Sequence, residues 1–287
     1  ADSDRNGAGT GGGIHITSPG TKAILYGTLI ENNTAVHGGG LAATHGASLF
    51  IQKGYNRCWN DKKCNVITQN KTHDHGGLGG AIYLINGHVH TSYTFFHQNR
   101  ANSGAVLYAD SGSTAFFRTS FIFDNGNNGQ DGWNDEYTLR LNNSYLILNQ
   151  VTMANNKTMN ASIYLNGGDT YRLENSIIYE PIVGTGATIT GISGTEECLV
   201  LNNDSGFNRL TDSIVGNPIF FDEINHDYHL MADSPAIDLC EKHSFSLSFD
   251  IDGDRIWDDP NIINAMGFRD AGADESMMGD VIFLDSF

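Results

Sequence analysis

The chain has 287 residues, of which 33 are acidic and 16 are basic, so its formal net charge at pH 7 is −17. Because such a surface repels nucleic acid and anionic membranes, the composition excludes nucleic acid as a partner. No apolar run approaches the roughly 20 residues that a membrane-spanning helix needs, and we therefore expect no membrane span.

A Gly-rich motif followed by a short apolar run recurs in the first half of the chain. Its copies are residues 11–16 (GGGIHI), 38–42 (GGGLA), 79–84 (GGAIYL) and 103–108 (SGAVLY). A spacing of 24 to 27 residues separates the equivalent apolar positions in four pairs: Ile14 and Leu41, Ile82 and Val106, Leu139 and Ile163, Ile163 and Ile189. A repeat of this length holds two or three short strands with their turns.

One such repeat cannot bury its own apolar face, so its strands must pair with those of the repeats before and after it. Amphipathic helical patterns are scarce, and the consensus of leucine-rich repeats is absent. The sequence therefore predicts an all-β solenoid of parallel strands joined by turns, a parallel β-helix with rungs of roughly 24–27 residues.

One interval is too long for a single repeat. Leu41 and Ile82 are 41 residues apart, and the excess falls around residues 55–63, where charge and cysteine replace apolar alternation. We expect a loop insertion near residues 53–66. A disulfide between Cys58 and Cys64 would hold this loop together.

Asparagines follow the expected strands at similar positions of the repeat. Stacked asparagines can form an internal amide ladder, whereas isolated ones are typical of exposed turns, and the sequence permits either interpretation. The asparagines concerned are Asn33, Asn70, Asn99, Asn125, Asn155 and Asn156.

Histidines and tyrosines are the next candidates for function. His73 and His75 flank Asp74 in a Gly-rich turn, but a metal site there needs a third ligand, so exposed turn histidines are favoured. His88 and His90 alternate on one strand and are expected on a solvated face. Tyrosines that point outward could stack on sugar rings or on a partner protein, while the others pack inward. They are Tyr83, Tyr93, Tyr108, Tyr137, Tyr145, Tyr164, Tyr171 and Tyr179.

A second disulfide is predicted between Cys198 and Cys240, which are 42 residues apart. This bridge would tie the last repeats to the C-terminal region. Zinc is the competing interpretation of the four cysteines, but no CxxC pair supports it.

A carboxylate cluster follows the second disulfide. Asp250, Asp252, Asp254 and Asp258 lie around Gly253, and such a loop can converge on Ca²⁺, which takes six to eight oxygen ligands. The match to an EF-hand is partial, and the same aspartates could instead cap backbone amides. Calcium is the only cofactor that the sequence suggests.

The C-terminal third also carries a specific succession of motifs. It contains residues 216–220 (GNPIF), 227–230 (DYHL), 233–238 (DSPAID), 250–254 (DIDGD) and 270–275 (DAGADE). This succession resembles the terminal region of large bacterial secreted β-helix proteins. Residues 79–82 (GGAI), 96–99 (FHQN) and 103–106 (SGAV) resemble the short paired motifs of chlamydial polymorphic outer membrane proteins and related right-handed β-helix repeat proteins.

The resemblance implies a right-handed β-helix of rungs over residues 1–213, closed by an irregular cap and tail over residues 214–287 in the same structural domain. It also implies a secreted or bacterial cell-surface location. The start at Ala1 fits a removed signal peptide and a longer parent protein equally well. Because these proteins share no single activity, the resemblance does not assign a function.

Three functions fit this architecture. The favoured one is a non-catalytic scaffold or adhesion module that binds a glycan or a surface protein. A polysaccharide lyase or glycoside hydrolase is the second, because charged residues lie in or beside the strands, although polygalacturonase and pectate-lyase signatures are absent. The third is a subunit that self-associates end to end or laterally. The charged residues considered for catalysis are Arg118, Arg140, Arg172, Asp110, Asp124 and Asp169.

Overall fold

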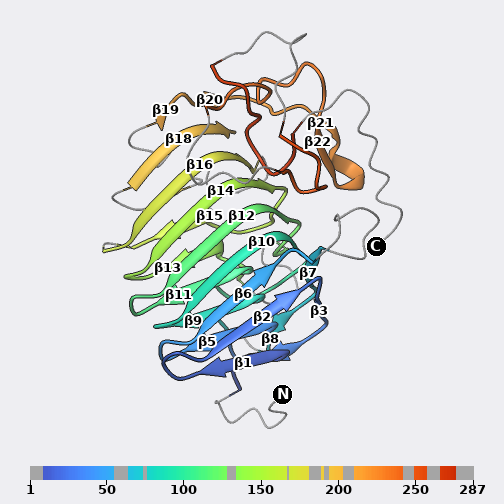
Figure 1. Cartoon of the computed structure of the whole chain (residues 1–287). Helices are drawn as coiled ribbons and strands as arrows, with labels where there is room; N and C mark the ends of the chain where they lie inside the picture. Colours follow the sequence, from blue (N-terminus) through green and yellow to red (C-terminus); the bar gives the residue numbers. More distant parts are fainter. Residues whose placement is uncertain are drawn as a thin grey trace.

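The computed structural model describes residues 9–54, 64–73, 76–127, 134–166, 168–180, 189–190, 194–202, 210–241, 249–256 and 266–275. Across these residues the protein is all-β with parallel sheets, and the only helical segment is the 3₁₀ turn η2 (Glu223–Asn225). Figure 1 shows the strands stacked one above another from the N-terminal to the C-terminal part of the chain. The main sheets do not close on each other, and the stack is compatible with a β-helix.

The first sheet has seven parallel strands whose spatial order is their order in the chain. Its strands are β1 (Ile14–Thr17), β5 (Leu41–Thr44), β9 (Ile82–Ile85), β11 (Leu107–Asp110), β13 (Tyr137–Leu141), β15 (Ala161–Leu165) and β17 (Ile189–Thr190). We call it the seven-stranded sheet.

The second sheet has eleven strands, and its longest members each continue through a bend. Its strands are β2 (Lys22–Tyr26), β3 (Leu29–Glu31), β6 (Ser48–Gln52), β7 (Asn65–Thr68), β10 (His88–His97), β12 (Thr114–Phe123), β14 (Tyr145–Ala154), β16 (Thr170–Tyr179), β18 (Gly194–Leu201), β19 (Leu210–Thr211) and β20 (Ile214–Val215). Two small sheets pair β4 (Thr34–Ala35) with β8 (Lys71–Thr72), and β21 (Phe220–Asp222) with β22 (Asp227–Leu230).

The register follows the predicted repeat with one correction. Ile14 pairs with Leu41 and Leu41 with Ile82, as the spacing predicted. Ile82, however, pairs with Leu107, not with Val106. The reason is Gly104, which has a positive φ of 70° three residues before Leu107, just as Gly79 has a φ of 69° three residues before Ile82. A left-handed glycine three residues before β9 and before β11 therefore sets the register of these two strands.

The long strands of the second sheet bend at one left-handed residue each. In β10, β12, β14, β16 and β18 a single residue with positive φ separates two straight halves that pair with the next strand. These residues are Tyr93, Thr119, Gln150, Asn175 and Cys198. The bend turns the second half of each strand to face a different side of the molecule.

A predicted asparagine ladder runs through the buried turns after these strands. The Asn70 side-chain amide donates to Asn99 Oδ1 at 3.1 Å, and that of Asn99 donates to Asn125 Oδ1 at 3.0 Å. Asn33 begins the series and Asn156 extends it. The ladder is confirmed over these five positions.

Two details of the ladder differ from the expectation. Asn155 is not part of it, because its amide donates to Asp124. After Asn156 the next position is Glu180, whose carboxylate accepts from the Asn156 backbone N–H at 2.7 Å and from its side-chain amide at 2.6 Å. Burial raises the pKa of Glu180 to about 8.

The C-terminal segment packs on the side of the sheets. A second apolar cluster joins outward residues of the bent strands, such as Phe121, Ile177 and Val200, to Tyr228 and Leu239 of the C-terminal segment. In its described part, the segment also runs back beside β14 and β16 (Figure 1).

Two backbone contacts fix this packing. The Gly272 N–H donates to the Asn175 carbonyl at 2.9 Å, and the Ala273 N–H donates to Thr152 Oγ1 at 3.0 Å. A Cβ at Gly272 would lie 2.8 Å from Thr152 Oγ1, and its φ of 110° is suited to glycine. Only glycine therefore allows this close approach.

The Cys198–Cys240 disulfide is formed, with a Cα–Cα distance of 5.5 Å, and ties β18 to the C-terminal segment as predicted. Cys64 is also disulfide-bonded. Its expected partner Cys58 and residues 55–63 of the expected insertion lie outside the described residues. β7 begins at Asn65, inside the range expected for that insertion.

Candidate functional sites

A row of aromatic and charged side chains crosses the outer face of the seven-stranded sheet. The register places Tyr83, Tyr108, Arg140 and Tyr164 side by side on successive strands. They alternate with the inward residues Ile82, Leu107, Leu139 and Ile163. Tyr83, Arg140 and Tyr164 are partly exposed, whereas Tyr108 is covered and only 7% exposed. Together with Tyr137 they form what we call the tyrosine–arginine row.

The rings of this row stack on one another. The ring centroids of Tyr83 and Tyr108 are 5.7 Å apart with planes 19° from parallel, and His37 covers the other side of Tyr83 at 5.0 Å and 17°. Both faces of Tyr83 are therefore occupied inside the protein. A sugar ring therefore cannot stack on Tyr83, and this residue could contact a ligand only through its ring edge and hydroxyl.

Polar groups accompany the rings. The Arg140 guanidinium lies 5.6 to 5.8 Å from the ring centres of Tyr108, Tyr137 and Tyr164, and donates to Glu136 at 3.2 Å. The Tyr108 hydroxyl donates to Asp110 at 3.2 Å and accepts from Asn142 at 2.9 Å. The row thus carries hydroxyl, amide, carboxylate and guanidinium groups that are hydrogen-bonded to one another.

A second candidate is a buried histidine among carboxylates in the C-terminal segment. His229 on β22 is bonded through Nδ1 to Asp227, and its Nε2 lies 3.0 Å from Asp252 Oδ2 and 3.8 Å from Asp274 Oδ1. The possible ligand atoms of His229, Asp252 and Asp274 all lie within 4.8 Å of one another. We call these three residues the His229 cluster.

The electrostatics of this region are unusual. Burial alone would lower the pKa of His229, but the charge of Asp274 and hydrogen bonds to Asp227 and Asp252 raise the pKa to about 11. Burial and the charge of Asp252 raise the pKa of Asp250, and burial and Asp270 raise the pKa of Glu275. The raised pKa values mean that Asp250 and Glu275 keep their protons to higher pH, which relieves the crowding of carboxylates near His229.

The predicted calcium ligands have different partners. Asp250 Oδ1 accepts from the Gly253 and Asp254 amides at 2.8 and 2.7 Å, which is the capping arrangement that the sequence offered as the alternative. Asp252 instead faces His229. Asp258 lies outside the described residues.

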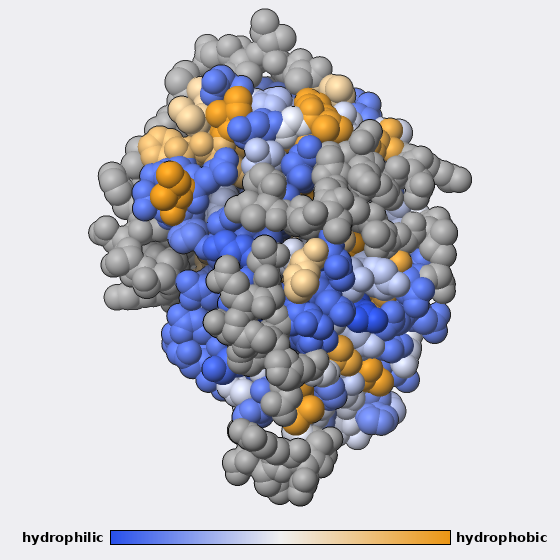
Figure 2. Space-filling model, turned by 180° about the vertical axis from the view of Figure 1, so that it is seen from behind, coloured by the Kyte–Doolittle hydropathy of each residue, from blue (hydrophilic) through white to orange (hydrophobic). Residues whose placement is uncertain are grey.

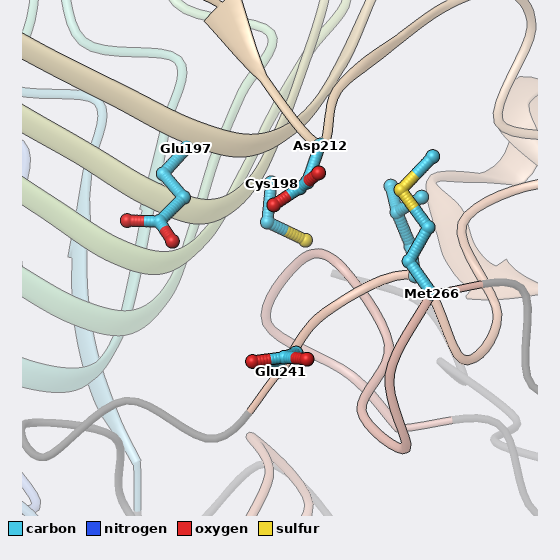
Figure 3. Close-up of a pocket in the computed structure, with 6 residues that line it drawn as sticks. Glu197, Cys198, Asp212, Glu241 and Met266 are labelled. Atoms are coloured by element: carbon cyan, nitrogen blue, oxygen red, sulfur yellow. The ribbon is translucent and has the colours of Figure 1, made fainter.

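A third candidate is a small acidic pocket beside the Cys198–Cys240 disulfide. It has a volume of about 80 Å³ and is lined by Glu197, Cys198, Asp212, Leu239, Glu241 and Met266. Figure 3 shows carboxylates of β18, of the residue after β19 and of the C-terminal segment around it.

Other predicted residues are held in separate contacts. His88 and His90 are exposed on β10, which confirms the solvated face. Of the turn histidines, His73 is exposed, and Asp74 and His75 lie outside the described residues. Arg172 donates to Glu174 at 2.6 Å, and Asp124 pairs with His226 at 2.8 Å.

Sequence reasoning missed His229 and Asp274 as chemical groups. Both lie in motifs that carry the family resemblance, but 45 residues separate them, and the Asp227-x-His229 alternation was the one local signal. Only the packing of β22 against the two later turns reveals the cluster.

No protein-family model, curated protein or solved structure matches this chain. In the part of the chain that the structure describes, no helix has the length and apolar character to cross a membrane. The apolar residues visible on the rear face form separate patches on a largely hydrophilic surface (Figure 2).

Proposed function

We propose that the chain is a right-handed parallel β-helix that acts outside the bacterial cell or on its surface as a non-catalytic adhesion module, and that it binds a neutral glycan along the tyrosine–arginine row. The disulfides support the location, because such bonds persist in oxidising compartments. The stacked register and the asparagine ladder support the β-helix.

The tyrosine–arginine row is the observation that carries the glycan assignment. Parallel strands lie about 4.8 Å apart, so the row repeats its polar groups at that interval along the stack. A repeating array of hydrogen-bonding groups suits an extended polymer with repeating hydroxyls. The net charge of −17 disfavours a polyuronate and favours a neutral chain.

Binding to a panel of neutral and uronic polysaccharides tests this proposal. We expect Tyr164→Ala to weaken binding of a neutral glycan about tenfold, the effect of losing about 1.4 kcal/mol. Tyr26→Ala is the matched control, because Tyr26 is 51% exposed on the other main sheet. Equal losses for both variants, or no binding by the wild type, would remove the assignment.

A glycoside hydrolase is the second candidate, and the acidic pocket favours it. Hydrolases need two carboxyl groups across the scissile bond, and Glu197, Asp212 and Glu241 supply three around one cavity. The same panel should be scored for reducing ends and unsaturated products, with Ca²⁺ and with chelator. Turnover that Glu241→Gln abolishes would establish the enzyme; binding without turnover supports adhesion.

Self-association is the third candidate. Within the described residues, β2 is an outermost strand of the second sheet, and Ile24, Tyr26 and Leu29 of β2 and β3 are exposed by 52%, 51% and 59%. Unpaired strand edges of this kind favour association. Light scattering over a concentration series would reveal filaments, and a constant mass would exclude them.

A further inference from the structure

We infer that His229, Asp252 and Asp274 bind one divalent transition-metal ion, of the Zn²⁺ or Mn²⁺ class, inside the C-terminal segment. The inference is independent of the glycan-binding proposal, because the cluster lies in a different part of the fold. It replaces the calcium loop expected from residues 250–258 with a different ligand set.

The geometry of the three side chains suits a small ion. His229 Nε2 lies 3.0 Å from Asp252 Oδ2 and 3.8 Å from Asp274 Oδ1. Ligands about 2.0–2.2 Å from a tetrahedral ion are roughly 3.4 Å apart, so the two distances bracket the required spacing. All three donor atoms lie within 4.8 Å of one another, so the widest pair must close by up to roughly 1.4 Å to enclose the ion.

The imidazole is already oriented for a metal, which would take the place of the Nε2 proton. Asp227 is bonded to Nδ1, which directs Nε2 at the two other carboxylates. Metal-binding histidines are held in this way by a carboxylate on the far ring nitrogen. Asp227 thus positions the ligand and does not itself bind the ion.

Buried charge provides the second, independent reason. Six carboxyl groups are buried in β22 and in residues 249–256 and 266–275, and they are opposed by the buried cations His229 and Arg269. Within the described residues, Asp250 Oδ2 and Glu275 Oε1 are buried without a hydrogen-bond partner. Three of these carboxylates, Asp227, Asp252 and Asp274, face the single cation His229, so a divalent ion in place of the His229 Nε2 proton would balance more of their charge. The six carboxyls are those of Asp227, Asp250, Asp252, Asp270, Asp274 and Glu275.

The donor set selects the class of metal. Calcium prefers six to eight oxygen ligands, whereas imidazole suits zinc and other transition metals. One nitrogen and two carboxylate oxygens therefore favour Zn²⁺ or Mn²⁺. Because all three ligands are buried, the ion would be structural and would join β22 to the two later turns.

The test begins with the whole protein stripped by chelator and dialysed separately against Zn²⁺, Mn²⁺ and Ca²⁺. We expect one equivalent of Zn²⁺ or Mn²⁺ per chain by mass spectrometry, and a rise in Tm of about 5 °C at 100-fold excess over Kd. Retention of no metal, or of Ca²⁺ alone, would overturn the inference.

Variants locate the ion. Asp274→Asn should lose the bound metal and the rise in Tm, whereas Asp233→Asn, at an exposed aspartate of the same segment, should keep both. If Asp274→Asn does not fold, X-ray absorption spectroscopy of the metal-loaded wild type identifies the ligand atoms around the ion. A single nitrogen ligand with oxygens supports the cluster, and an all-oxygen shell contradicts it.

Discussion

At the scale of single residues, the asparagine ladder explains why the repeats keep their register. Each amide bonds to the next repeat and also to backbone carbonyls, as Asn125 does with the carbonyls of Phe96 and Phe123 at 2.9 and 3.0 Å. Asn70, Asn99, Asn125 and Asn156 are fully buried, so a missing partner there would leave a polar group without water.

The loss of stability when a ladder asparagine is replaced should depend on its position in the ladder. We expect Asn125→Ala to lower the free energy of unfolding by about 3 kcal/mol, because several buried groups lose their partner. Asn33→Ala, at the partly exposed first position, should cost only about 1 kcal/mol. Urea unfolding of both variants measures the difference, and equal losses would argue against a cooperative ladder.

Because Glu180 is buried, we expect the free energy of unfolding to depend on pH. Its pKa is raised from 4.5 to about 8, so the folded protein holds a proton that the unfolded chain has released. The stabilisation is therefore complete below pH 4.5 and is lost as pH rises through 8. We measure the free energy of unfolding in urea at pH values from 5 to 8. Over this range it should fall less for Glu180→Gln than for the wild type.

An exposed carboxylate provides the control for this experiment. Asp233→Asn should follow the wild type at every pH, because Asp233 lies at the surface. A Glu180→Gln profile parallel to that of the wild type would show that Glu180 does not titrate between pH 4.5 and 8.

At the scale of elements, the bend in each long strand decides what the C-terminal segment covers. Left-handed residues such as Gln150 and Asn175 turn the second halves of β14 and β16. The outward side chains of these second halves then form an apolar face. The C-terminal segment buries this face and is tied to it by Cys198 and Cys240.

The contribution of the disulfide to the free energy of unfolding can therefore be predicted. A 42-residue loop corresponds to about 4 kcal/mol of chain entropy, so Cys198→Ala with Cys240→Ala should lower the free energy of unfolding by about that amount. The segment should also become the first site of limited proteolysis. Unchanged proteolysis would show that apolar packing alone holds it.

At the scale of the whole molecule, charge opposes the fold. The chain carries −17 while its core is continuous through the repeats, so self-repulsion acts on a single cooperative body. Partners that are strongly acidic are repelled by the same field, which is why a neutral glycan is proposed.

Salt should therefore stabilise the protein. Raising NaCl from about 0.01 M to 0.15 M shortens the Debye length from about 30 Å to 8 Å, and we expect Tm to rise by a few degrees. Calorimetry measures the shift, with sucrose at equal osmolality as the uncharged comparison. A Tm that falls with salt would mean that attractive ion pairs outweigh the repulsion.

The sequence by itself determined the parallel strands, most of the register, the ladder positions and the Cys198–Cys240 bridge. These features repeat locally or depend on few residues, and strand pairing between neighbouring repeats converts a sequence period directly into spatial order. The spacing alone predicted the wrong partner for Ile82, Val106 in place of Leu107, because the left-handed Gly104 fixes the pairing of Leu107.

Only the tertiary structure decided where the C-terminal segment packs, which tyrosine faces are covered and that Asp252 and Asp274 meet His229. Each of these depends on contacts between residues far apart in the chain and without a period, and several on one close approach such as that of Gly272 to Thr152. Local pattern contains no information about such contacts, because packing free energy selects them among many sterically possible arrangements.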